Sequence, residues 1–360
     1  MANTENREKI LEVKHLCMYF KKGKEDFKAV DDVNFHVYRG EVLGIVGESG
    51  CGKTTVGRTI IKLYDATDGE VYFKGRRIVA GTRTISEKLK AAKKAKNSEE
   101  IKKWSDELKR AKHDQRHCDD DYKKDTGDVN PLITKIQMIF QDPIASLNPR
   151  MTVREIISEG LTIRGIKDKE YIQNKVYEVL DLVGLVPEHA DRYPHEFSGG
   201  QRQRIGIARS IVLEPELMIA DEPVSALDVS IQAQVINLLN DLRTKMNLTI
   251  MFVAHDLSVV KYFSDRIAVM YFGKIVEIAT SDELFKHPMH PYTQALLSAI
   301  PIPDPHVEKA RKRILYNPKE THDYSVDKPS MREIYEGHYV YCNDHEEAAY
   351  KEELSKSDAQ

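Results

Sequence analysis

Gly47-Glu48-Ser49-Gly50-Cys51-Gly52-Lys53-Thr54 is the stretch that decides the fold of this 360-residue chain. It fits the pattern G-x-x-x-x-G-K-[S/T], and it lies between an apolar run, Val42 to Val46, and a predicted helix, Thr55 to Leu63. Glycines let the backbone N–H groups of such a loop point inward around a polyphosphate, and the following helix N-terminus adds a positive field. The sequence therefore predicts a phosphate-binding loop between a strand and a helix.

The residue types in this loop predict specific roles. Lys53 is expected to reach the β- and γ-phosphates, and Thr54 to place its hydroxyl on Mg²⁺, a hard cation that prefers oxygen ligands. The remaining nucleotide contacts of the loop are expected from Gly47, Ser49, Gly50, Cys51, Gly52 and Thr55. The competing interpretation is an accidental glycine-rich turn, which should arise in roughly one chain per hundred of this length.

A second apolar run, Leu217 to Ala220, is too short for a helix and ends at Asp221 and Glu222. Ligands of parallel α/β sheets gather at the carboxyl ends of the strands. Asp221 is therefore expected to hold Mg²⁺ through its outer shell, and Glu222 to orient and polarise an attacking water. Two adjacent acids are usually a solvated turn, but the preceding strand and the phosphate loop favour catalysis.

A third apolar run, Leu248 to Ala254, delivers His255 at its carboxyl end. A lone histidine is more often structural. Here the imidazole would lie where a γ-phosphate is expected, which suits a hydrogen bond to phosphate and water.

Ser198-Gly199-Gly200-Gln201 has the S-x-x-Q form of a capping box and opens an amphipathic helix through Ile205 to Ile211. Exposed N–H groups at this glycine-bearing helix start make a second anion site. One nucleotide does not need two such sites in one subunit. The pattern therefore predicts a head-to-tail dimer in which this segment serves a nucleotide held by the other subunit.

Taken together, the motifs resemble those of the nucleotide-binding subunits of ATP-binding-cassette transporters, over roughly Ile10 to Ala299 apart from one insertion. The resemblance implies an α/β P-loop NTPase fold with a RecA-like sheet core, an antiparallel β subdomain and a helical signature subdomain. It also implies ATP and Mg²⁺ as ligands.

The same resemblance implies roles for further residues. Phe20 matches the aromatic residue that stacks on adenine, with Tyr19 as the alternative if the register is off by one. Gln141 matches the glutamine that touches Mg²⁺ and water and senses the membrane partner. Ser198 to Gln201 match the signature, and Asp228 lies in the loop that crosses the dimer interface.

Two stretches, Phe140 to Arg150 and His290 to Pro301, resemble the oligopeptide and dipeptide importers, a group that includes nickel and some sugar importers. The match is closest to the F-type ATPase of oligopeptide permeases. This implies a D-type ATPase as the paired subunit, two transmembrane permease subunits and a substrate-binding protein. Many members carry a C-terminal cysteine cluster for an iron–sulfur centre. Only Cys342 lies in that region here, so no cluster is predicted.

The expected organisation is a cassette domain over residues 1–300 and a small importer-type tail over 301–360. A helical subdomain is expected over 150–197, with the groove that docks the permease lying between Gln141 and this subdomain. The tail is expected to begin with an extended proline-rich linker and to pack on its own subunit or on the paired ATPase.

An insertion over about 80–134 is dense in lysine and acid. Sparse apolar residues at helical spacing on either side of Asn97-Ser98-Glu99-Glu100, a potential helix cap, predict a projecting antiparallel helical hairpin. His113, His117, Cys118 and the acids 119–121 allow a metal cluster, but a solvated, partly disordered stretch is the favoured interpretation.

Composition places limits on location and partners. The four cysteines show no paired spacing, as expected of a reduced cytosolic protein. A net charge of −3 argues against broad attraction to nucleic acid or anionic lipid. The polar start, Met1 to Lys9, predicts no secretion signal, and no apolar stretch is long enough to cross a bilayer. Together with these limits, the resemblance to transporter ATPases implies a peripheral protein at the cytoplasmic face of the membrane, with other chains forming the pore.

The favoured function is ATP hydrolysis coupled to oligopeptide import. Dipeptides, nickel and oligosaccharides remain alternative cargoes, because cargo contacts reside in the binding protein and the permease. A non-transport cassette ATPase acting on chromosomes or ribosomes is less favoured, as is a regulator that binds nucleotide without hydrolysing it.

Overall fold

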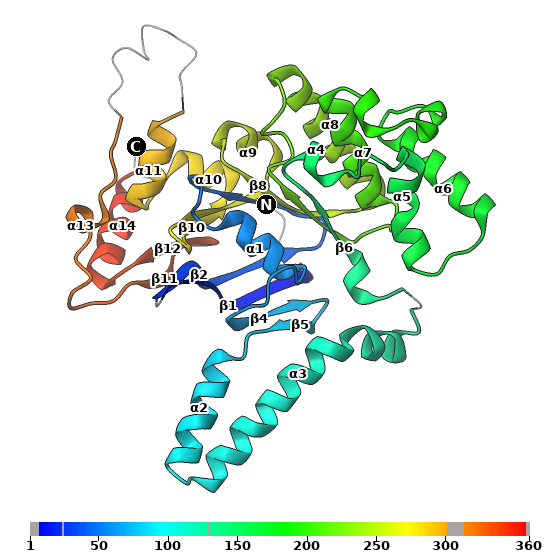
Figure 1. Ribbon diagram of the computed structural model, residues 1–360. Helices are drawn as coiled ribbons and strands as arrows, with labels where there is room; N and C mark the ends of the chain where they lie inside the picture. Colours follow the sequence, from blue (N-terminus) through cyan, green and yellow to red (C-terminus); the bar gives the residue numbers. More distant parts are fainter. Residues whose placement is uncertain (1–6, 24, 129, 301–312, 358–360) are drawn as a thin grey trace, which may run out of the picture.

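The computed structural model describes residues 7–23, 25–128, 130–300 and 313–357, which build two β-sheets and the helices packed on them (Figure 1). The larger sheet is mixed, with eight strands in the order β11-β12-β10-β9-β3-β8-β7-β6, and the smaller has the order β2-β1-β4-β5. The predicted α/β architecture is confirmed.

The centre of the larger sheet is parallel. Its strands are β6 (Ile136–Ile139), β7 (Leu217–Asp221), β8 (Thr249–Ala254), β3 (Val42–Val46) and β9 (Arg266–Tyr271). Strands β3, β7 and β8 are buried along their whole length, as is typical of parallel strands covered on both faces. Because Val46 lies beside Ala254, these neighbouring strands end in step.

The smaller sheet is antiparallel and consists of β1 (Lys9–Lys22), β2 (Glu25–Tyr38), β4 (Asp68–Phe73) and β5 (Arg76–Ala80). Its apolar face packs with helix α1 (Lys53–Ile60) and one face of the larger sheet in a single buried cluster. The helix begins two residues earlier than predicted. It ends before Lys62, whose φ of 62° is left-handed and cannot continue a helix.

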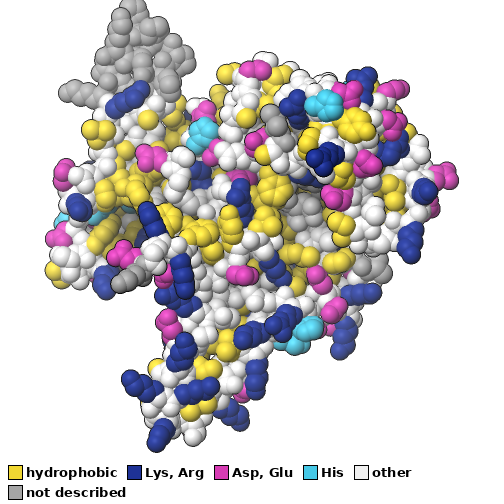
Figure 2. Space-filling model, in the orientation of Figure 1, with side chains coloured by type: hydrophobic (Ala, Val, Ile, Leu, Met, Phe, Trp, Pro, Cys, Tyr) yellow, Lys and Arg dark blue, Asp and Glu magenta, His cyan; other side chains and the backbone are white. Residues whose placement is uncertain are grey.

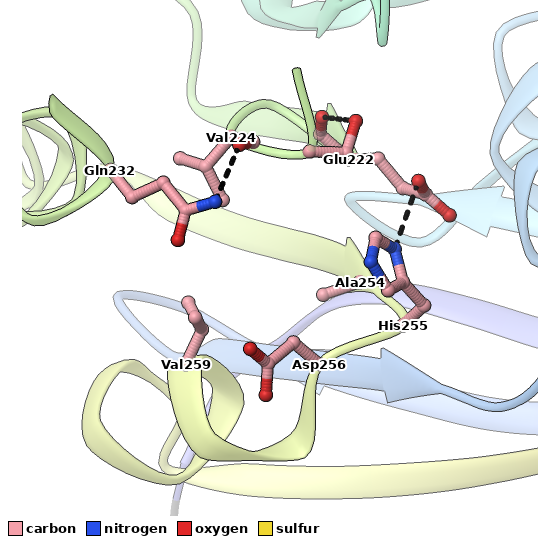
Figure 3. Close-up of a pocket in the computed structure, with 8 residues that line it drawn as sticks. Glu222, Val224, Gln232, Ala254, His255, Asp256 and Val259 are labelled. Atoms are coloured by element: carbon pink, nitrogen blue, oxygen red, sulfur yellow. Dashed lines mark hydrogen bonds and ion pairs between the residues drawn. The ribbon is translucent and has the colours of Figure 1, made fainter. Parts of the chain in front are cut away.

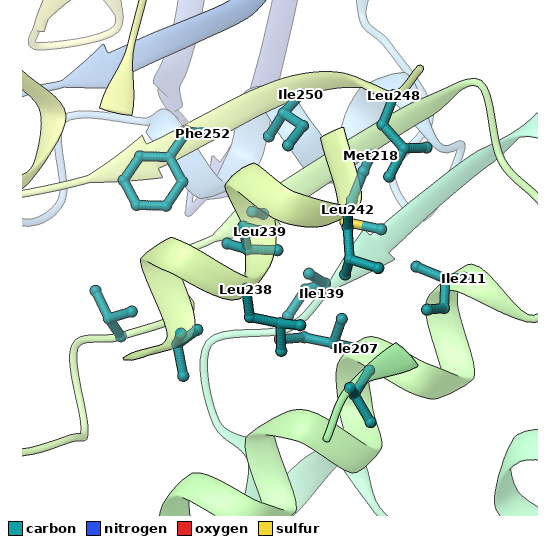
Figure 4. Packing of buried hydrophobic residues seen from close by; sticks show 14 of the residues in the cluster. Ile139, Ile207, Ile211, Met218, Leu238, Leu239, Leu242, Leu248, Ile250 and Phe252 are labelled. Atoms are coloured by element: carbon teal, nitrogen blue, oxygen red, sulfur yellow. The ribbon is translucent and has the colours of Figure 1, made fainter. Parts of the chain in front are cut away.

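The other face of the larger sheet carries the remaining helices of the cassette (Figure 1). These are α4 (Pro143–Ser146), α5 (Val153–Ile163), α6 (Lys169–Leu182), α7 (Gly199–Ile211), α8 (Val229–Met246), α9 (Leu257–Phe263), α10 (Ser281–Lys286) and α11 (Pro291–Ser298), with 3-10 turns at Pro187–Asp191 and Pro194–Glu196. A further 3-10 turn, Leu132–Lys135, packs on the opposite side, in the cluster shared with α1 and the smaller sheet. Figure 4 shows side chains of α7 and α8 meeting those of β7 and β8, for example Ile211, Leu242 and Met218.

The insertion forms an antiparallel hairpin of α2 (Arg83–Lys94) and α3 (Ser98–Thr126), which stands out beyond the smaller sheet (Figure 1). The Asn97 side chain caps α3 by accepting the N–H of Glu100. The expected partial disorder of residues 113–121 is wrong, because they lie in the continuous helix α3 and Cys118 packs in the core beside α1. Nowhere in the part of the chain that the structure describes do histidine, cysteine and acidic side chains form a group that could hold a metal.

The C-terminal tail packs on its own subunit. It contains α13 (Pro318–Thr321), β11 (Ser330–Tyr335), β12 (His338–Cys342) and α14 (Asp344–Ser357), and β12 extends the larger sheet by pairing with β10 (Lys274–Thr280). Its buried His338 donates to Glu277 on β10 at 2.7 Å. The predicted proline-rich linker, 301–312, lies outside the described residues.

Candidate nucleotide-binding site

Four parallel strands deliver the predicted residues to one edge of the sheet. A loop or turn follows the carboxyl end of β3, β6, β7 and β8, and each carries at least one of these side chains. They surround a cavity of about 530 Å³ whose lining consists of Phe20, Phe27, Ala29, Ser49, Gly50, Gly52, Lys53, Thr54, Thr55, Gln141, Glu222 and His255. Segments more than 200 residues apart in sequence therefore contribute to one site.

The phosphate loop wraps closely around its own lysine. Lys53 Nζ donates to the carbonyl oxygens of Gly47 at 2.7 Å and Glu48 at 2.9 Å. Gly52 has a φ of 110°, and a Cβ there would lie 2.1 Å from the carbonyl oxygen of Ala29. Only glycine fits this position, because another residue would clash with the backbone of β2.

Thr54 and Asp221 meet beside this loop. The threonine hydroxyl donates to Asp221 Oδ1 at 2.7 Å, while the buried Oδ2 has no hydrogen-bond partner among the described residues. Burial raises the pKa of the Asp221 carboxyl. An unsatisfied carboxylate oxygen next to a hydroxyl is the oxygen-only donor set that Mg²⁺ takes, so these two residues fit that ion.

Glu222 forms hydrogen bonds with two other predicted site residues. Its Oε2 accepts hydrogen bonds from Gln141 Nε2 at 3.0 Å and from His255 Nδ1 at 3.1 Å, the second of which appears in Figure 3. The residue has a left-handed φ of 43°, and its N–H donates to Val253 on β8. A strained backbone held by its neighbours is typical of catalytic positions.

Two aromatic rings form one side of the cavity. Phe20 and Phe27 are cross-strand partners in β1 and β2, and the Phe20 ring packs edge-on against Tyr64 with centroids 5.3 Å apart. The hydroxyl of the alternative residue, Tyr19, bonds to Asp31 instead, and Tyr19 does not line the cavity. The sequence analysis did not predict a role for Phe27. A predicted β-hairpin that pairs Phe27 with Phe20 would have indicated that both rings lie at the same site.

The signature segment lies apart from this cavity. Ser198 and Gln201 form the predicted capping box of α7, with the Ser198 N–H donating to Gln201 Oε1 at 3.1 Å. A Cβ on Gly200 would lie 2.6 Å from Ile231 Cγ2, so α7 starts in close contact with α8. Asp228 caps α8 by accepting the N–H of Ile231. Neither Ser198–Gln201 nor Asp228 is among the residues that line the cavity of the same subunit.

Tyr292 is a further residue that contacts the phosphate loop. Its hydroxyl accepts the backbone N–H of Glu48 at 3.1 Å, and its ring packs on Tyr271 with centroids 4.4 Å apart. Burial raises the pKa of the Tyr292 hydroxyl, which therefore stays neutral. Sequence reasoning used His290-Pro291-Tyr292 only to narrow the group of importers, so this contact was missed.

A groove of about 310 Å³ runs between β6 and α5. Its lining includes Ile61, Ile133, Phe140, Ile156 and Ile163, and the Ile163 side chain is 80% exposed. An apolar groove of this kind, open to solvent, is typical of a docking surface for another protein.

Comparison with known families matches two parts of the chain. A family model described as "ABC transporter" matches residues 30–118 and 107–225. A second, described as "Oligopeptide/dipeptide transporter, C-terminal region", matches residues 276–326. The second match contains Tyr292 and most of β10.

Curated relatives match over nearly the full length. The oligopeptide transport ATP-binding protein OppF of Bacillus subtilis is 50% identical, over 95% of this chain and 99% of that protein. OppF of Streptococcus mutans is 51% identical, over 97% and 99%. The dipeptide transport ATP-binding protein DppF of Lactococcus lactis is 46% identical, over 95% and 97%.

Solved structures share the fold. The post-hydrolysis dimer of the ATP-binding cassette MJ0796 bound to ADP and Pi is 26% identical, with a TM-score of 0.56 over 75% of this chain and 98% of that one. CbiO1 from Clostridium perfringens is 23% identical, with a TM-score of 0.57 over 78% and 92%. None of the helices in the described ranges is long and apolar enough to span a membrane.

Proposed function

This chain belongs to the ATP-binding-cassette transporter family, and on that premise we propose that it is the ATP-hydrolysing subunit of an importer for oligopeptides. The observation that carries this proposal is the meeting of Lys53, Thr54, Gln141, Glu222 and His255 around one cavity. Peptide as cargo is supported by the names of the full-length relatives and by the match of the C-terminal region.

The cavity residues divide the chemistry of hydrolysis among them. Lys53, once released from the loop carbonyls, would pair with the β- and γ-phosphates of ATP. Thr54 and Asp221 would hold Mg²⁺, which neutralises charge on the transferred phosphoryl group. Glu222 would accept the proton of the attacking water, while Gln141 and His255 hold its carboxylate in place.

The adenine would stack between or against Phe20 and Phe27. Both rings line the cavity, and their residues are paired across the β1–β2 hairpin. Flat aromatic faces bind any purine ring through stacking, so this pair supplies affinity, while the phosphate contacts supply the chemistry.

The signature segment would complete a site on a second ATPase subunit. Its residues at the start of α7, Ser198–Gln201, do not line the cavity of their own chain, and the MJ0796 cassette of similar fold was solved as a dimer. Head-to-tail pairing would place Ser198–Gln201 and Asp228 of each subunit at the other's nucleotide. A D-type paralogue is the proposed second subunit.

The membrane partners would be two permease subunits, supplied with cargo by a substrate-binding protein. A permease helix would dock in the groove between β6 and α5, where Phe140 precedes Gln141. A movement of the docked helix would thereby be transmitted to the Gln141 side-chain amide, which donates a hydrogen bond to Glu222. With this arrangement the chain would lie at the cytoplasmic face of the membrane.

Reconstitution tests the proposal. The intact assembly, purified through a tag on this chain and placed in lipid vesicles, should take up a labelled oligopeptide only when ATP and Mg²⁺ are supplied on the side of this subunit. An assembly that hydrolyses ATP but moves no peptide would contradict the proposed cargo. A dipeptide is the second candidate, favoured by the DppF relative, and competition between labelled dipeptide and longer peptides separates the two.

A further inference from the structure

The end of the α2–α3 hairpin carries a concentrated positive charge. Residues 88–105 contain seven lysines and two glutamates, whereas residues 106–125 contain six basic and seven acidic residues. The net charge of −3 for the whole chain conceals this separation. We call residues 88–105 the hairpin tip and 106–125 the hairpin base. Figure 2 shows the dark blue side chains gathered around the tip.

The tip lysines have no acidic partners among the residues that the structure describes. All seven side chains are exposed, and none forms an ion pair with another described residue. In the base, by contrast, Lys109 pairs with Asp106 and Arg110 with Glu107. Lys90 and Lys94 lie four residues apart on α2, where like charges repel each other and disfavour the helix. The stability of the hairpin itself therefore does not explain the charge at the tip.

The only tryptophan of the chain lies among these lysines. The Trp104 ring has Lys88 Nζ at 4.6 Å and Lys103 Nζ at 5.0 Å from its centroid. Tryptophan is the side chain that settles at the boundary between lipid headgroups and acyl chains, because its ring is apolar and its N–H is polar. Lysine stems are likewise apolar below a charged head.

The hairpin is a rigid arm anchored beside the docking groove. Ala92 and Ala111 are buried where α2 packs on α3, and the 29 residues of α3 span ~43 Å at 1.5 Å per residue. At the base, Lys62 bonds to the carbonyl of Gln115, and the adjacent Ile61 lines the groove. A permease in the groove would place this arm next to a bilayer.

We propose that the hairpin tip binds the surface of an anionic phospholipid membrane. Clustered lysines are attracted to the negative surface potential of such a leaflet, and Trp104 inserts at the headgroup level. The inference rests on the proposed function, because a transporter subunit is the kind of cassette ATPase held at a bilayer. It assigns the insertion a role as a second membrane contact, separate from the permease.

Vesicle binding of the full chain tests this. The wild-type protein should sediment with vesicles of phosphatidylcholine and phosphatidylglycerol at least about tenfold better than with phosphatidylcholine alone. The preference should disappear near 1 M salt, where the Debye length falls from about 10 Å to about 3 Å. Trp104 emission should shift to shorter wavelength with the anionic vesicles only.

Charge reversal locates the contact. Lys93→Glu, Lys94→Glu and Lys96→Glu together should lower binding to anionic vesicles at least about tenfold. The control variant makes the same charge change in the base, with Lys112→Glu, Lys123→Glu and Lys124→Glu together. It should retain most of the binding to anionic vesicles. Both variants should keep the wild-type helical circular dichroism.

Three outcomes would overturn the proposal: equal binding to both vesicle types, equal loss in tip and base variants, or no vesicle binding together with a tip variant that fails to assemble with the permease. The last would assign the tip to an acidic surface of the permease. ATP hydrolysis by the assembly is measured separately, so its absence would count against the proposed function and not against the lipid contact.

Discussion

The hydroxyl of Tyr292 accepts a hydrogen bond from the backbone N–H of Glu48 at 3.1 Å. The bond ties α11, in the region matched by the importer-type C-terminal family, to the second residue of the phosphate loop. The phosphate loop is therefore held in place by α11, which is not part of the strand–loop–helix motif of β3, the loop and α1.

Tyr292→Phe should weaken ATP binding without abolishing catalysis. The change removes one hydrogen bond worth about 0.5–1.5 kcal/mol, so the KM for ATP should rise roughly 2- to 12-fold while kcat changes less. Tyr316→Phe is the matched control, because its ring packs against Tyr292 but its hydroxyl makes no hydrogen bond to the loop among the described residues. Steady-state kinetics of the assembly measure both, and equal effects of the two variants would show that the hydrogen bond from Glu48 to Tyr292 makes no specific contribution to ATP binding.

Glu222→Gln should lower ATP turnover by about 10²- to 10⁴-fold, the contribution of a general base. Nucleotide binding should persist, because the amide still accepts from Gln141 and His255 and leaves the loop untouched. Phosphate release and labelled-ATP binding give the two readouts. Glu188→Gln, at an exposed position in a 3-10 turn, should behave as wild type. Unchanged turnover in Glu222→Gln would remove this residue from the mechanism.

Phe27→Ala should reduce nucleotide affinity, since stacking on an aromatic ring contributes about 1–3 kcal/mol per base. The effect should appear with ATP and be absent with inorganic triphosphate, which has no base to stack. Tyr262→Ala removes a ring that is 90% exposed on α9 and serves as the control. A fluorescent nucleotide titration measures affinity; equal affinities for ATP in wild type and Phe27→Ala would place the base elsewhere.

His338 should make the stability of the C-terminal tail depend on pH. Its Nε2 lies 2.7 Å from Glu277 Oε1, and its Nδ1 lies 3.4 Å from Glu283 Oε1. Desolvation by burial lowers the pKa of His338, but the hydrogen bonds and charges of these two carboxylates outweigh it, so the pKa is raised. A raised folded-state pKa means that the stabilisation is complete below the unfolded value of about 6.5 and is lost as pH rises through the folded value. His287 also faces Glu283, at 3.1 Å.

His338→Gln should therefore cost about 3–5 kcal/mol at pH 6, as expected when one partner of a buried pair is removed, and less at pH 9. Thermal unfolding followed by circular dichroism at both pH values measures the difference. His345→Gln, at an exposed position of α14, should show no such change with pH. A constant gap between wild type and His338→Gln at both pH values would mean that folding does not raise the pKa of His338, and a gap that widens at pH 9 would mean that folding lowers it.

Much of the site was predictable because its parts are encoded locally. The loop from Gly47 to Thr54, the acids after β7 and the capping box at Ser198 each depend on residues adjacent in sequence, and short apolar runs reveal the strands that precede the first two. The rule that ligands gather at the carboxyl ends of parallel strands then predicts that these residues meet at one edge of the sheet. The contacts of the insertion were harder to predict from the sequence. Cys118 is buried against residues from other elements, and the charged residues next to it in sequence suggested disorder.

The sequence by itself thus determined the family of the fold, the phosphate loop and the position of two carboxylates at the end of β7, because each is a local pattern with its own physical cause. The tertiary structure alone decided that Phe27 faces Phe20, that Tyr292 supports the loop and that β12 extends the sheet. These relationships join residues that are distant along the chain or opposite across a hairpin. Their free energy comes from packing and hydrogen bonds that exist only after the chain has folded, and no local pattern records them.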